Sequence, residues 1–141
     1  MARSSSNVKS TAVIQPQTDA AQKIESIKMA MVQIETAESV EHLDEIVAIE
    51  GVDCLFVGPT DLSISLGVPG QPQSPELVQA IERVIERCKA HGVATAIQAN
   101  DLAYARRWVE QGMEIISYSS EIGLLVAAAA AGIQAIRAAR V

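Results

Sequence analysis

Gln33, Glu35 and Asp61 are the residues whose types and spacing best suit chemistry. Gln33 and Glu35 lie two residues apart at the end of the apolar run 29–35, so on a strand their side chains point to the same face. Asp61 follows the next apolar run, in the sequence Gly58-Pro59-Thr60-Asp61-Leu62-Ser63. Carboxylates from two adjacent strand ends can chelate one hard divalent cation, with water and substrate oxygens completing the octahedron. This pattern would suit Mg²⁺ or Mn²⁺, and no His or Cys stands nearby to suggest zinc.

Each carboxylate also has a purely structural interpretation. Glu35 could cap the helix that follows it or pair with a lysine, because a buried carboxylate without a partner costs several kcal/mol. Asp61 could cap the turn before Leu62 and Ser63. Acidic residues are common at strand ends of α/β proteins, so two carboxylates alone leave these alternatives open.

The elements that must position these residues alternate between apolar runs and helical periodicity. The sequence predicts strands at 29–35, 52–57, 93–99 and 113–118, and helices at 40–49, 74–91, 101–111 and 121–140, with a long loop at 60–74. Asn100 or Asp101 is expected to cap the third helix. Three helices end in a glycine that leads directly into an apolar run, at Gly51, Gly92 and Gly112. The repeated strand-helix unit, present four times, predicts an α/β fold with a parallel sheet.

Two architectures fit four such units: an open doubly wound sheet, and half of an eight-fold (β/α) barrel. An open sheet usually carries its site where the strand order reverses, whereas a barrel collects polar residues from the carboxyl ends of many strands. Polar residues follow every predicted strand here, at 35–36, 59–61, 98–100 and 119–121. This favours the half-barrel.

Composition excludes several other classes of protein. The 141 residues are 49% hydrophobic and 20% charged, which allows one packed domain and excludes global disorder. A net charge of −6 argues against a nucleic-acid partner. The most apolar stretch, 122–136, is shorter than a membrane span and is interrupted by Gly132, so no membrane partner is expected.

The two cysteines and the first residues of the chain bear on compartment and domain boundaries. Cys54 and Cys88 form neither a disulfide framework nor a zinc spacing, which fits a reducing cytosol. Residues 1–27 lack the apolar core of a secretory signal. We predict that residues 1–27 are a disordered or irregular N-terminal extension, that residues 28–141 form the half-barrel domain, and that the protein is cytoplasmic.

The segment 31–70 resembles the class II pyruvate aldolases, the HpcH/HpaI aldolase and citrate lyase family. The residues that carry the resemblance are 32–36 (Val-Gln-Ile-Glu-Thr), 43–46 (Leu-Asp-Glu-Ile), 51–53 (Gly-Val-Asp), 56–63 (Phe-Val-Gly-Pro-Thr-Asp-Leu-Ser), 66–67 and 69–72. A looser similarity continues to about residue 126. Together the strand glutamate and the Gly-Pro-x-Asp-Leu sequence are specific, although neither is so alone.

The resemblance implies a role for each of these positions. Members of this family are (β/α) barrels that bind pyruvate as its enolate on a divalent cation; their metal ligands match Glu35 and Asp61. The glutamine that contacts the bound ketoacid matches Gln33, and backbone amides near Thr60 and Asp61 would hold its carboxylate. The implied reaction is reversible cleavage of a 4-hydroxy-2-oxoacid to pyruvate and an aldehyde, and the cofactor is Mg²⁺ or Mn²⁺. The small-molecule partners are then a 2-oxoacid and an aldehyde.

This chain also departs from the family that it resembles. It supplies four strands that resemble the second half of the family's barrel, so the family's catalytic arginine and its His-Asp pair have no counterpart. No catalytic residue is identified, and whether the chain is an enzyme by itself stays open. His42 and His91 are expected to be solvated, and Gln98 occupies a strand that is usually apolar. The alternative is a non-catalytic half-barrel that self-associates and binds a metal without turnover. In either case we expect a homo-oligomer or a partner that supplies the missing half, because a four-stranded parallel sheet leaves two free edges.

Overall fold

The computed structural model describes residues 28–139, so the predicted extension at 1–27 lies outside the described residues. Its centre is one sheet of four strands: β1 (Met31–Ile34), β2 (Cys54–Val57), β3 (Ala94–Ala99) and β4 (Ile115–Tyr118). All neighbouring strands are parallel, and their order in the sheet is β1-β2-β3-β4. A strand order that follows the chain without reversal is the order of a barrel segment and lacks the switch point of a doubly wound sheet. The predicted α/β fold with four parallel β/α units is confirmed.

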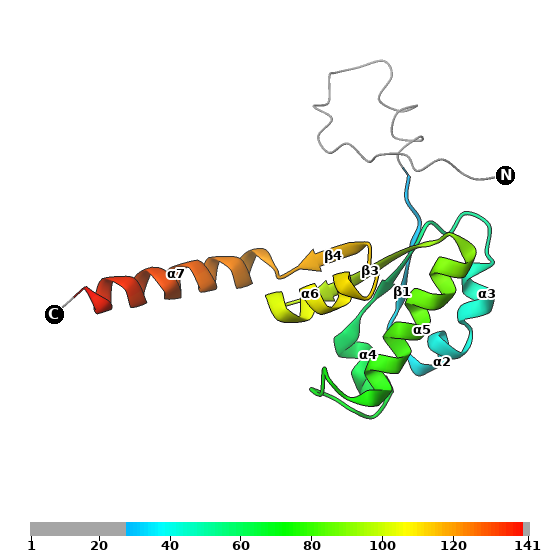
Figure 1. Ribbon diagram of the computed structural model, residues 1–141, viewed down its shortest axis with the longest axis horizontal. Helices are drawn as coiled ribbons and strands as arrows, with labels where there is room; N and C mark the ends of the chain where they lie inside the picture. The colour runs from blue at the N-terminus through cyan, green and yellow to red at the C-terminus, as the bar shows by residue number, and fades with distance from the viewer. Residues whose placement is uncertain (1–27, 140–141) are drawn as a thin grey trace, which may run out of the picture.

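The helices of the chain are α2 (Ala37–Glu41), α3 (Leu43–Val47), α4 (Pro59–Ser65), α5 (Pro75–His91), α6 (Leu102–Glu110) and α7 (Glu121–Ala138). Helices α5 and α6 contact the strands directly, α2, α3 and α4 pack against α5, and no helix of residues 28–139 covers the other face of the sheet, called the bare face below (Figure 1). Helices α2 to α6 cover the sheet, and α7 extends away from it. The bare face corresponds to the inside of a barrel, because right-handed crossovers place all helices outside.

Alternation along the strands separates the core from the bare face. Ile34, Leu55 and Ile97 are completely buried against the helices, where they pack in one cluster with Leu43 and Trp108. Gln33 is on the opposite face, level in the strand register with the half-buried Phe56. Gln33 therefore projects from the face of the sheet that is opposite the packed core.

Two expected helix boundaries are confirmed by their caps. The Oγ atom of Ser74 accepts a hydrogen bond from the Leu77 amide at 3.3 Å, and α5 ends at Gly92, whose φ of 71° is left-handed. Of the two candidate caps of α6, Asp101 is the one used: its Oδ1 accepts from the Tyr104 amide at 2.8 Å. These caps fix the loops on either side of β3.

Two predictions on helices were wrong. The single helix expected at 40–49 is two short helices, because His42 leaves the helical conformation (φ −94°, ψ 16°) between α2 and α3. The loop expected at 60–74 begins with helix α4, with Gly58 as its N-cap and Pro59 in its first turn. Gly58-Pro59 is therefore a helix start, since proline suits the first helical turn, where no amide hydrogen is needed.

Helix α7 stands apart from the rest of the domain. None of its residues is buried, and its large apolar side chains face solvent, among them Leu125 at 70% and Ile136 at 69% exposure. Over 18 residues its mean hydropathy is 1.4, so within the described part of the chain one helix is long and apolar enough to cross a membrane by length and composition. This corrects the expectation that no stretch reaches that length. One such helix is a weak indication of a span, and five consecutive alanines at 127–131 contribute much of its hydropathy.

Candidate active site

Gln33 and Glu35 meet at the carboxyl end of β1. Nε2 of Gln33 donates a hydrogen bond to Oε2 of Glu35 at 2.8 Å. Gly58 lies beside them at the end of β2, where its amide donates to the carbonyl of Ile34 at 3.1 Å. A β-carbon at position 58 would lie 3.1 Å from Nε2 of Gln33 and 3.4 Å from the β-carbon of Glu35. Glycine at 58 therefore allows β2 to pass close to this pair.

Glu35 does not cap the following helix, which was one of its structural alternatives. Thr36 is the N-cap of α2: its Oγ1 accepts from the Ser39 amide at 3.0 Å, and Oγ of Ser39 accepts from the Thr36 amide at 3.2 Å. This reciprocal arrangement is a capping box. The half-buried carboxylate of Glu35 is consequently free of the helix end and turned toward Gln33.

Asp61 lies in the first turn of α4, which follows β2, and Glu35 follows the neighbouring strand β1. Gly58 is the N-cap of this helix, and no side chain caps it, so the alternative role of Asp61 as a turn cap is not seen. A pocket of about 210 Å³ opens beside Asp61 and is also lined by Gln33, Thr60 and Gln98. The structure therefore places three of the four expected site residues around one pocket, while Glu35 reaches it through its hydrogen bond to Gln33.

The amides of Thr60 and Asp61 belong to the first turn of α4. The first intrahelical bond after the Gly58 cap is donated by Leu62, to the Gly58 carbonyl at 2.9 Å. Amides that precede this bond have no acceptor within a helix. Both amides therefore lie at the pocket with hydrogen-bonding capacity for an external acceptor.

The donor set decides which cation these residues could hold. Glu35 and Asp61 are oxygen donors that follow the adjacent strands β1 and β2, and hard cations prefer such ligands. Among residues 28–139, no group of three or more His, Cys, Asp or Glu side chains gathers into a metal site. The side chains fit Mg²⁺ or Mn²⁺, which commonly keep several water ligands and use one or two carboxylates plus substrate oxygens.

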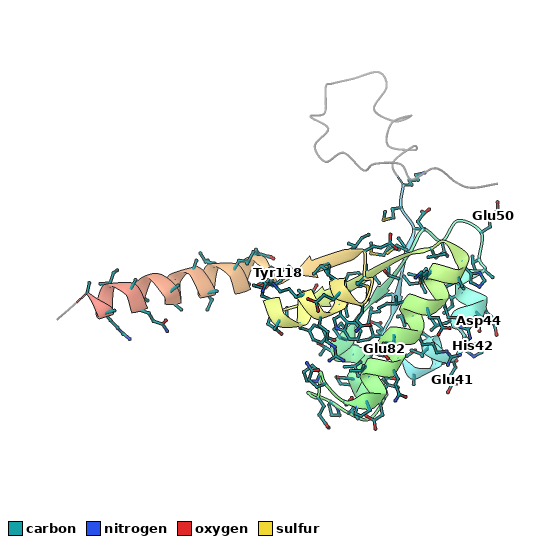
Figure 2. The ribbon with its side chains drawn as sticks, viewed as in Figure 1. Glu41, His42, Asp44, Glu50, Glu82 and Tyr118 are labelled. Carbon is teal, nitrogen blue, oxygen red and sulfur yellow. The ribbon has the colours of Figure 1, made fainter. Side chains whose placement is uncertain are left out.

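The two histidines lie outside this region, as expected. His42 is half exposed at the junction of α2 and α3, where Nδ1 lies 3.0 Å from Oε1 of Glu45, and Figure 2 shows it on the outer side of the helices. His91 is the last residue of α5 and is exposed. Neither lines the pocket beside Asp61.

A second pocket, which sequence reasoning missed, adjoins the first. It also measures about 210 Å³ and shares Pro59, Thr60 and Gln98 with the pocket at Asp61. Its far wall comes from the loop at 70–72 and from the largely buried Tyr104 of α6. Gln98, a polar residue in an otherwise apolar strand, was the one signal that pointed to it.

Comparison with known proteins identifies a family that the chain resembles in sequence. A sequence model of the HpcH/HpaI aldolase/citrate lyase family matches residues 4–135. The 5-keto-4-deoxy-D-glucarate aldolases of Shigella boydii serotype 18 and Enterobacter sp. strain 638 are each 42% identical over 94 residues. These residues are 67% of this chain and 37% of each relative. The chain thus spans little more than a third of the length of the curated relatives it matches.

Solved structures show the same relation in three dimensions. A HpcH/HpaI aldolase/citrate lyase family protein from Burkholderia cenocepacia J2315 superposes with a TM-score of 0.78 at 39% identity, over 84% of this chain and 46% of that one. The HpcH/HpaI aldolase of Desulfitobacterium hafniense DCB-2 gives a TM-score of 0.74 at 31% identity, over 87% and 49%. In each comparison the chain corresponds to about half of the larger fold.

Proposed function

This chain belongs to the HpcH/HpaI aldolase/citrate lyase family, and we propose that it is a metal-dependent lyase that reversibly cleaves 4-hydroxy-2-oxoacids to pyruvate and an aldehyde. The curated relatives are named for one keto-deoxy sugar acid of this class, the dicarboxylate 5-keto-4-deoxy-D-glucarate. The observation that carries the proposal is the Gln33–Glu35 hydrogen bond of 2.8 Å beside a pocket that Asp61 lines.

Each group of this site has a task in the proposed reaction. Glu35 and Asp61 would hold Mg²⁺ or Mn²⁺, and Gln33 would orient Glu35 and contact the ketoacid. The amides of Thr60 and Asp61 would bind the ketoacid carboxylate, since unpaired amides at a helix start favour anions. A bound divalent cation supplies Lewis-acid stabilisation of the charge that develops on the ketone oxygen.

The bond changes of this reaction require a group that moves protons. In the cleavage direction the bond between C3 and C4 breaks, and the C4 hydroxyl loses its proton as it becomes the aldehyde carbonyl. C3 then gains a proton and becomes the methyl group of pyruvate. A group that moves these protons must lie within hydrogen-bond reach of the substrate. Neither His42 nor His91 borders the pocket, so we propose that another polypeptide supplies this group.

The partner we propose is either a second copy of this chain or a chain that carries the other half of the barrel. Among residues 28–139, strands β1 and β4 each pair with only one neighbour, and no helix covers the bare face of the sheet (Figure 1). Parallel sheets are normally covered on both faces. A partner on the bare face would close the site, because Gln33 projects from that face.

A second candidate function is a non-catalytic half-barrel that self-associates and binds a divalent cation without turnover. The observation that favours it is the complete exposure of α7 together with the distance of both histidines from the site. For either function we propose a cytoplasmic location. The structure describes Cys54 and Cys88 as buried free thiols, a state that a reducing compartment maintains.

One experiment separates metal binding from turnover. Mn²⁺ affinity is measured by calorimetry for the 141-residue chain and for Glu35→Gln, Asp61→Asn and the control Glu50→Gln, an exposed carboxylate in the loop before β2 that Figure 2 labels. Both site variants should lose affinity, whereas the control should keep it. Unchanged affinity in both site variants would overturn the assignment. Pyruvate release from a 4-hydroxy-2-oxoacid, measured with and without Mn²⁺, then distinguishes the lyase from the non-catalytic half-barrel.

A further inference from the structure

The second pocket continues the candidate active site on the far side of Thr60 and Gln98. Both residues, with Pro59, line both pockets, so the two pockets adjoin near the carboxyl end of β3. The loop at 70–72 and the side chains of Asn100 and Tyr104 form the rest of this space. A molecule whose ketoacid end lies at Asp61 would therefore have its other end directed into the second pocket.

Hydrogen-bonding groups of both kinds line this pocket. Nε2 of Gln98 donates to Oδ1 of Asn100 at 3.2 Å and to the carbonyl of Ser119 at 3.3 Å. These bonds leave Oε1 of Gln98 as an acceptor and Nδ2 of Asn100 as a donor for a ligand. A hydroxyl group can satisfy both, because it donates and accepts, whereas a carboxylate only accepts.

The hydroxyl group of Tyr104 adds an unsatisfied donor. Tyr104 is 7% exposed, and its buried hydroxyl has only the ring of Trp108 beside it as a weak hydrogen-bond partner, so its own proton has no acceptor of good geometry. Burial raises the pKa of this phenol, partly opposed by the neighbouring Trp108 and Arg107, so the group keeps its proton. A buried polar group without a partner is costly, and a bound ligand oxygen is one way to satisfy it.

The charge around the pocket argues against an anionic ligand. No lysine or arginine is among the residues that line it, and the one ionisable carboxylate there, Asp101, already accepts from the Tyr104 amide. The nearest turn of α6 carries Arg107, but this guanidinium bonds to Gln73 and lies 5.1 Å from the centre of the Trp108 ring. A carboxylate in the pocket would lack a cationic partner and face Asp101.

We propose that this second pocket binds the uncharged, hydroxyl-bearing fragment of the 4-hydroxy-2-oxoacid, the part that is released as the aldehyde. This proposal rests on the function proposed above, which places the ketoacid end of the same substrate at Asp61. A volume of about 210 Å³ equals that of about seven water molecules, which suits a three-carbon hydroxyaldehyde with its six heavy atoms. Gln98, Asn100 and Tyr104 are then the residues that select a polyhydroxylated fragment over an apolar or anionic one.

The test uses two small probes that differ in charge. Glycerol and glycerate carry the same three-carbon backbone, and only glycerate has a carboxylate. Each is titrated into the ¹⁵N-labelled 141-residue chain without metal, and the shifts of the Asn100 and Tyr104 amides and of the Gln98 side-chain amide are followed. Glycerol should shift these signals in a saturable way, and glycerate should bind at least several-fold more weakly.

Variants of single groups identify the contacts. Tyr104→Phe removes a hydroxyl whose proton has no acceptor of good geometry in the free protein, so the fold should persist while the glycerol affinity falls about 2- to 10-fold, the effect of one hydrogen bond. Gln98→Leu should weaken binding similarly. Tyr118→Phe is the matched control, because Tyr118 ends β4 next to α7 and lines neither pocket (Figure 2).

The outcomes for the pocket and for the metal site are distinguishable. Glu35→Gln should abolish Mn²⁺ binding and leave the glycerol titration unchanged, so each measurement reports on one proposal. Absence of saturable glycerol shifts, equal or tighter binding of glycerate, or an unchanged affinity in Tyr104→Phe would each overturn the proposed pocket.

Discussion

The side-chain amide of Gln33 donates a 2.8 Å hydrogen bond to Oε2 of Glu35, two residues farther along the chain. The bond engages Oε2 of the carboxylate, and Oε1 takes no part in it. Among residues 28–139, this is the side-chain hydrogen bond that holds the Glu35 carboxylate. Gln33 is thus a positioning residue for the carboxylate, in addition to any contact with a ligand.

Gly58→Ala should disturb this pair without removing either member. The new β-carbon would lie 3.1 Å from Nε2 of Gln33 and 3.4 Å from the β-carbon of Glu35, so the pair must shift. We expect Mn²⁺ affinity to fall about tenfold, a typical effect of disturbing a group that orients a metal ligand. Calorimetric titration measures the change.

Gly132→Ala is the control for this substitution. Gly132 lies in α7, and a β-carbon there would meet no atom within 4 Å. Its Mn²⁺ affinity should equal that of the parent chain. Equal affinity of Gly58→Ala and the parent would show that the Gln33–Glu35 pair does not orient a metal ligand.

The fold was largely predictable because its signals are local. Strand and helix periodicities, the Ser74 cap and the left-handed Gly92 each act within a few residues, and the structure bears them out. Helix α4 was missed because Gly58-Pro59 ends a strand and starts a helix at the same place, and the two signals look alike in sequence. The exposure of α7 could not be predicted from periodicity either, because a helical period does not show whether the apolar side chains have a surface to pack against.

The candidate site was predictable only where one strand carries it. Gln33 and Glu35 share a face through the two-residue period of a strand, and the parallel register then brings Gly58 beside them. The second pocket depends on the approach of the loop at 70–72 to Tyr104, a tertiary contact that no spacing encodes.

The chain should associate in solution because no residue of α7 is buried against the rest of residues 28–139. We expect a dimer or larger species in sedimentation velocity at micromolar concentration, since exposed apolar patches of this kind mark interaction surfaces. Leu125→Glu, at a side chain that is 70% exposed, should shift the population toward monomer. Ile49→Glu, at a 57% exposed side chain outside α7, should not. A strictly monomeric parent chain would contradict this prediction, and co-flotation with lipid vesicles would instead assign α7 to a membrane.

Both cysteines should be inert in the folded chain. Burial is the main cause that raises the pKa of the Cys54 and Cys88 thiols, that of Cys88 to about 12, and neither side chain is exposed. At pH 8 a pKa of about 12 leaves about one thiolate in ten thousand, and the thiolate is the reactive form. Iodoacetamide should therefore modify neither residue until denaturant is added, when both should react. Rapid alkylation of either cysteine in the native chain would show that α5 and β2 open more easily than their packing indicates.

The contact between His42 and Glu45 should make stability depend on pH. The hydrogen bond that His42 Nδ1 donates to Glu45, followed by the charge of the same carboxylate, raises the pKa of His42 above its ordinary value of 6.5. A raised pKa in the folded chain means that the contact stabilises the fold fully below pH 6.5 and loses this effect as the pH rises through the folded pKa. Glu45→Gln should therefore lower the urea midpoint relative to the parent at pH 5.5 and change it less at pH 8.5. A difference that is the same at both pH values would mean that the ion pair is not formed in solution, where an exposed pair competes with water.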